Sequence, residues 1–113
     1  MKGEKKAMFE EFNRVSTVRE GIDLGSMEFR KLKEFIGQTI HVDGFFFTQG
    51  KYGEQVVVVG NGYKINMPAK AVEDFKKMRA DKPTLEAILS GHLIITSIAL
   101  TPKGSVNYLY KDC

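Results

Sequence analysis

The chain has 113 residues, of which 42% are hydrophobic and 27% charged, and these proportions fit one compact domain and exclude a disordered chain. Lysine and arginine total 17 against 14 acidic residues, so the formal charge of +3 permits a polyanionic partner without requiring one. The single cysteine, Cys113, excludes an internal disulfide framework, and because no secretory signal or membrane-spanning run is found we expect a cytoplasmic protein with no membrane partner.

Residues 1–25 mix charged residues with spaced apolar residues and show no clean period, which predicts an N-terminal arm that packs on another surface. We expect a single domain over residues 26–113. A short amphipathic helix is predicted at its start, over residues 26–36, where apolar residues recur every three or four positions until Gly37 ends the pattern.

Three strands are predicted next, over residues 39–48, 55–59 and 63–67. These runs are rich in valine, isoleucine, phenylalanine and tyrosine, and glycines bound them. Between the second and third strands, Asn61-Gly62 supplies the positive φ angles of a tight hairpin turn. The three strands should therefore form an antiparallel meander.

Helices and two further strands complete the predicted order. Pro68 can occupy the first turn of a helix, and the residues after it form one apolar stripe. Asp81 is a candidate N-cap for a second, shorter helix that Gly91 would end. Residues 92–101 and 105–111 have extended patterns, so the chain returns to strands.

This order predicts an all-β core with helices. A five-stranded antiparallel barrel with its helix between strands three and four, here preceded by the arm and a short helix, is the arrangement of an OB-fold. The run of four valines at residues 56–59 supports a barrel, because a strand covered on one face only would alternate with polar residues. The competing arrangement is an open α+β sheet, and we favour the barrel.

The sequence contains no recognisable catalytic motif or metal-binding motif. His41 and His92 each lie in a predicted strand and are interpreted as surface histidines rather than metal ligands. No serine, cysteine or threonine lies in a nucleophile motif, and residues 60–62 form a hairpin turn rather than a dinucleotide-binding loop. We therefore expect no enzyme, no metal and no cofactor.

Aromatic residues interleave with lysines along the predicted strands, and this pairing suits a nucleic-acid strand. Aromatic rings stack on unpaired bases, at about 1 to 3 kcal/mol per base, while lysines bind the phosphates. In an OB barrel, strands two and three and the flanking loops bind such oligomers. The candidate nucleic-acid-binding residues are Phe45, Phe47, Lys51, Tyr52, Tyr63, Lys64, Lys70, Lys103, Tyr108 and Tyr110.

Strand alternation ranks the phenylalanines among these candidates. Val42 shares parity with Phe46, so without a bulge Phe45 and Phe47 should point outward, although a covered barrel strand could equally bury Phe45. Tyr52 lies at a predicted turn with no evident packing role, and it is the strongest candidate for ligand contact.

Each of the remaining candidate residues has two possible roles. Tyr63 either stacks on a base or covers the hairpin, while Lys64 points to the other face of its strand. Tyr108 and Tyr110 share a face with Val106, so they either pack in the core or extend the groove. The candidate lysines either contact phosphates or only keep the protein soluble.

A resemblance to a known family adds to these patterns. Residues 50–56, 66–68, 88–91 and 106–110, together with the order of elements over residues 37–112, resemble the small OB-fold single-stranded DNA-binding proteins of bacteriophages and related mobile elements. The resemblance implies a protein that coats and protects single-stranded DNA during replication or recombination, without catalysis. It also implies a host bacterial cytoplasm if a phage encodes the chain.

The resemblance also bears on partners. Replication or recombination proteins would be further partners, although the sequence ends at Tyr110-Lys111-Asp112-Cys113 rather than in the acidic tip through which cellular single-strand binders recruit them. Side-by-side copies, held by apolar residues of the arm, would form a homo-oligomer with a larger footprint. The alternative is an OB-fold protein-interaction module without nucleic-acid binding. A cold-shock type RNA binder is less favoured because its clustered aromatic motifs are missing.

Overall fold

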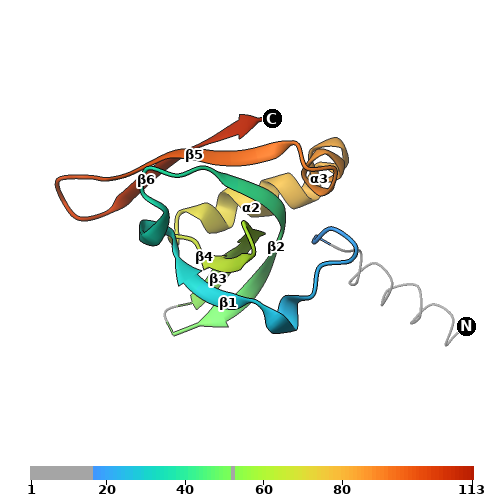
Figure 1. The fold of residues 1–113 in the computed structure, drawn as a ribbon, viewed down its shortest axis with the longest axis horizontal. Coiled ribbons are helices and arrows are strands. Elements are labelled where there is room, and N and C mark those ends of the chain that lie inside the picture. The colour runs from blue at the N-terminus through green and yellow to red at the C-terminus, as the bar shows by residue number, and fades with distance from the viewer. Residues whose placement is uncertain (1–16, 52) are drawn as a thin grey trace, which may run out of the picture.

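The computed structural model of this chain describes residues 17–51 and 53–113. Over these residues the protein is mostly β, with six strands curled into a half-barrel and two α-helices (Figure 1). The strands are β1 (Glu28–Lys31), β2 (Ile40–Gly50), β3 (Gly53–Gly60), β4 (Tyr63–Asn66), β5 (Leu93–Leu100) and β6 (Val106–Asp112). The helices are α2 (Ala71–Ala80) and α3 (Lys82–Leu89), with short 3-10 helices η1 (Leu24–Ser26) and η2 (Leu32–Phe35).

The six strands form one sheet in the order β1-β4-β3-β2-β5-β6. The β1–β4 pair is parallel, and the other pairs are antiparallel. Because β1 and β6 end the sheet, the curl leaves the barrel open between them. We call this open side the seam. The β5–β6 hairpin projects to the left in Figure 1.

The predicted meander is confirmed in β2, β3 and β4. Asn61 and Gly62 have φ angles of 52° and 84°, the positive values that a tight hairpin turn requires. The Asn61 side chain also fixes the turn to β2, since its Oδ1 accepts from the His41 amide at 3.0 Å and its Nδ2 donates to the Thr39 carbonyl at 3.0 Å. All four valines of residues 56–59 are buried, as the apolar run predicts.

A bulge divides β2 into two halves. The register shifts between Val42 and Gly44, and β5 pairs only with the first half of the strand, before the bulge. After the bulge, residues 17–19 pair with the edge of β2 that β5 no longer covers. The Phe45 amide donates to the Thr17 carbonyl at 2.8 Å, and the Arg19 amide donates to the Asp43 carbonyl at 2.7 Å. The first described residues of the predicted arm are therefore hydrogen-bonded to β2.

Both predicted helices after the meander are confirmed, and they cover the interior of the half-barrel. Phe75 of α2 packs between Phe45 and Tyr110, with ring centroids 4.9 and 5.7 Å away. Asp81 caps α3 by accepting from the Thr84 amide at 3.3 Å. Among the described residues, no helix is both long and apolar enough to cross a membrane.

The helix predicted over residues 26–36 is wrong. Residues 28–31 instead form β1, and only η2 is helical, so the sheet has six strands rather than five and is not wholly antiparallel. Leu32 and Phe35, two of the recurring apolar residues of that stretch, are nevertheless buried together, because a three-residue spacing also places side chains on one face of a 3-10 turn. Residues 28–31 have only a weak preference for a helix. Pairing with the open edge of β4 satisfies the backbone hydrogen-bonding groups of both strands, and this gain is larger than the lost helical preference.

Candidate nucleic-acid interface

The three phenylalanines of β2 do not lie as strand alternation predicts. Phe45 is fully buried, at 0% exposure, so its ring is closed to a ligand. The bulge between Val42 and Gly44 inserts one residue and reverses the parity, so that Val42 and Phe45 both face the core. The expectation that Phe45 and Phe47 point outward is therefore wrong.

Phe47 is half-buried at the margin of the core. Its ring meets Phe45 edge to face, with centroids 5.9 Å apart, and the Arg79 guanidinium lies 4.6 Å from the ring centroid. The Phe47 ring therefore packs against the core and also pairs with a cation. Phe46 has the opposite parity and is half-buried on the outer face of β2.

The β2–β3 hairpin holds two further candidates. Lys51 is exposed at its turn. Tyr52, the strongest candidate from the sequence, lies outside the described residues. Beside this hairpin, Glu54 forms an ion pair with Lys76 of α2, at 2.7 Å, so its carboxylate is already neutralised by a lysine.

Tyr63 and Lys64 serve different faces of β4. The Tyr63 ring packs edge to face on Phe35, with centroids 6.0 Å apart, and the Arg30 guanidinium lies 4.8 Å from its centroid. Lys64 points to the outer face, where its Nζ lies 4.4 Å from the centre of the Phe29 ring. The structure thus favours the covering role for Tyr63.

Tyr108 and Tyr110 share the inner face of β6, and both rings pack against the core. The Tyr110 hydroxyl donates to Asp74 Oδ2 at 2.9 Å, and burial raises the pKa of this phenol well above its ordinary value. Tyr108 is half-buried, burial raises its pKa as well, and Lys70 Nζ lies 5.2 Å from its ring centroid. Tyr108 and Lys70 therefore form a cation-aromatic pair near the surface.

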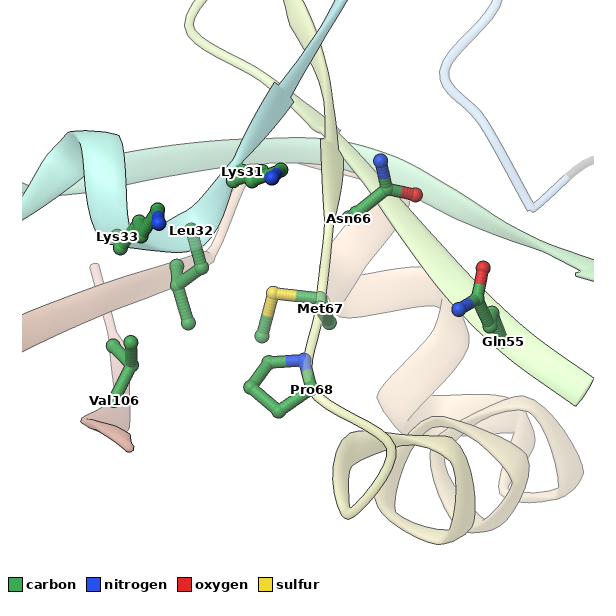
Figure 2. Close-up of a pocket in the computed structure, with 8 residues that line it drawn as sticks. All are labelled: Lys31, Leu32, Lys33, Gln55, Asn66, Met67, Pro68 and Val106. Carbon is green, nitrogen blue, oxygen red and sulfur yellow. The ribbon is translucent and has the colours of Figure 1, made fainter. Parts of the chain in front are cut away.

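An open depression of about 370 Å³ lies at the seam, where β1 and η2 meet the ends of β4 and β6. Figure 2 shows Leu32, Lys33 and Val106 on one side of Met67 and Pro68, and Gln55 on the other. The lining residues are Lys31, Leu32, Lys33, Gln55, Asn66, Met67, Pro68 and Val106. The depression therefore combines an apolar floor with cationic and amide groups at its rim.

Some of the sequence candidates lie close in the chain to residues that line the depression. Lys70 lies two residues after the lining residue Pro68, and Tyr108 lies two residues after Val106 on the same face of β6. Lys103 is exposed in the turn that precedes Val106. Lys70, Lys103 and Tyr108 are thus each two or three residues from a residue that lines the depression.

The charges at the seam are mainly positive. Among the described residues, Lys31 and Lys33 have no carboxylate within ion-pair distance, because Glu28 and Glu34 both bind Arg30. Asp74, the acid closest to the Tyr108 region, accepts the Tyr110 hydrogen bond. An anionic ligand would therefore meet lysines rather than carboxylates at the depression.

Lys31, Lys33, Gln55 and Asn66 were not predicted as site residues. The two lysines fit the outward face of the expected helix, and nothing in the local pattern indicated that β1 and β6 would bound an opening. Pairing of β1 with β4 matches Lys31 with Asn66, and this long-range contact creates the rim of the depression.

Comparisons with protein families, with curated protein sequences and with solved structures find no match. Within residues 17–51 and 53–113 no group of three or more histidine, cysteine, aspartate or glutamate side chains could hold a metal ion.

Proposed function

We propose that this protein binds single-stranded DNA at the seam, with little dependence on base sequence, and coats the strand during replication or recombination. The single observation that carries the proposal is the seam: lysines that pair with no carboxylate of the described residues border an open depression, and the half-buried ring of Tyr108 lies two residues along β6 from the lining residue Val106. Lysines would bind the phosphates, and Tyr108 with the apolar floor would hold unstacked bases.

The arrangement of strands supports an OB-type barrel as the scaffold. Without β1, the sheet order is β4-β3-β2-β5-β6, and the helices lie between β4 and β5 in the chain. Full closure of these five strands would require β4 to pair with β6, but β4 pairs with β1 instead. An OB-fold is a partly open barrel that binds oligomers beside its second and third strands and two of its loops. The seam lies beside the corresponding strand β4.

A single strand suits this site better than a duplex. Bases in a duplex are already paired and stacked, so Tyr108 and the apolar floor gain nothing unless the duplex melts. A formal charge of +3 is also small for binding through electrostatics alone. We therefore expect oligo-dT to bind more tightly than a matched duplex at the same salt concentration.

The proposal is tested by titrating the purified protein into labelled oligo-dT, matched duplex DNA and single-stranded RNA. Tyr108→Leu should weaken oligo-dT binding about tenfold, because stacking contributes about 1 to 3 kcal/mol per base. Leu109→Ala is the matched control, since Leu109 is 53% exposed on the opposite face of the same strand. Lys70→Gln is a second variant on an exposed residue, which should weaken binding without disturbing the core.

A folded protein that binds none of the nucleic acids would contradict the proposal and favour the protein-interaction module. Equal affinity of the wild type and both seam variants for oligo-dT would also contradict it, because the strand would then bind elsewhere.

A further inference from the structure

We propose that Phe29 and Lys64 form a second contact site for the same DNA strand, on the outer face of β1 and β4. This inference rests on the proposed function, and it extends the footprint beyond the seam. Phe29 lies outside the segment that resembles known single-strand binders, in the stretch predicted as an amphipathic helix.

The exposure of Phe29 is the first observation. Its side chain is 52% exposed on a strand of only four residues, while Leu32 and Phe35, which follow it, are buried. Aromatic rings of this size usually bury most of their surface in a small domain. A half-exposed ring on an edge strand is therefore available for stacking.

Lys64 gives this ring a neighbouring cation. Its Nζ lies 4.4 Å from the ring centroid, which places the ammonium group beside any base that stacks on Phe29. Among the described residues Lys64 has no carboxylate partner, since the nearby Glu28 and Glu34 both pair with Arg30. The pair thus repeats the chemistry of Tyr108 and Lys70.

The strand register connects this pair to the seam. Phe29 is matched with Lys64, and two residues further along the same face Lys31 is matched with Asn66. Lys31 and Asn66 both line the depression (Figure 2). Two residues of strand span roughly 7 Å, about the spacing of successive nucleotides in an extended strand, so one DNA strand can pass from Phe29 into the seam.

The test compares oligo-dT of about 4, 8 and 16 nucleotides, the range that single OB-folds cover. For the wild type, affinity should rise with length as the strand reaches the second site. Phe29→Ala should lower affinity about tenfold for the longer oligonucleotides and leave the shortest unchanged, because the seam alone accommodates the shortest. Lys64→Gln should weaken the salt dependence of the longer complexes only.

Ile36→Ala is the matched control, because Ile36 is another exposed apolar residue, at 40%, and has no ring for a base to stack on. Unchanged affinity of Phe29→Ala at every length, with Tyr108→Leu still weakened, would overturn this inference and leave the proposed function standing. An equal loss at every length would overturn it too, because Phe29 would then belong to the seam site. Failure of the wild type to bind oligo-dT would refute the proposed function itself.

Discussion

Tyr108 and Tyr110 illustrate how one face of a strand supports two roles. Both rings point inward from β6 and touch edge to face, with centroids 5.5 Å apart. Tyr110 also packs on Phe75 and donates to Asp74, so its ring and its hydroxyl both contact residues of α2. Tyr108 lies two residues nearer the β5–β6 hairpin, is half-buried against the core, and has Lys70 as its neighbour. Its hydroxyl does not bond to Asp74, so Tyr108 is the tyrosine that we propose for ligand contact.

The raised pKa of Tyr110 predicts a loss of stability at high pH. The folded state keeps this phenol protonated above about pH 10, where the unfolded chain loses the proton. Stability from this group is therefore complete below pH 10 and decreases as the pH rises above it. Tyr110→Phe should cost about 1 kcal/mol at neutral pH through the lost hydrogen bond and should weaken the alkaline decrease.

Urea unfolding of the wild type and of Tyr110→Phe at neutral pH and above pH 10 measures both effects. If the two proteins lost stability in parallel as the pH rises, Tyr110 would not be the group that responds.

At the scale of elements, the bulge in β2 organises one side of the half-barrel. It turns Phe45 into the core and lets residues 17–19 replace β5 at the strand edge. Gly44 permits this close crossing, because a Cβ at this position would overlap the Thr17 carbonyl and the Val18 Cα.

Gly44→Ala should therefore destabilise the protein by about 1 to 3 kcal/mol, the usual cost of overpacking. Gly25→Ala is the control, since its Cβ would meet only Asp23 Oδ1 at an ordinary 3.5 Å. Denaturant unfolding gives the two free energies, and amide exchange at Phe45 should become faster in Gly44→Ala alone. Equal stability of the two variants would contradict the steric role of Gly44.

The elements that the sequence predicted correctly are those with local causes. The Asn61-Gly62 turn, the Asp81 cap and the valine run each depend on neighbouring residues, and all three are found. The errors have long-range causes. Residues 28–31 form a strand that pairs with β4, and Phe45 turns inward because the bulge in β2 reverses the parity of the strand.

The same distinction applies to the candidate site. Lys70 and Tyr108 could be proposed from residue type, because rings and lysines suit nucleotides wherever they are exposed. Lys31 and Lys33 could not, since their place at the depression depends on the pairing of β1 with β4.

At the scale of the whole molecule, the distribution of charge matters more than its total. The formal charge is only +3, but several acids are paired with arginine or lysine, as in Arg19–Asp43 and Lys76–Glu54. Lys31 and Lys33 are left facing the depression. A modestly charged protein can therefore present a locally cationic site.

Binding should accordingly weaken as the salt concentration rises. Each phosphate contact to a single strand should add about 0.7 to the steepness with which log K falls against log salt. Replacing Lys31 and Lys33 by glutamine should reduce this steepness by about 1.4 in total. Replacing Lys77 and Lys82, exposed lysines of α2 and α3 that do not line the depression, should leave it unchanged. Titrations at several salt concentrations measure the slopes, and equal slopes for the two double variants would remove the seam lysines from the interface.

The most direct test of the seam as a DNA site is a titration of isotope-labelled protein with unlabelled oligo-dT, followed through the backbone amide signals. We predict that the largest shifts fall at the seam, in residues 31–33, 66–70 and 106–108, while the signals of α3 stay in place. Shifts concentrated on α3, or no shifts at saturating oligo-dT, would contradict the account.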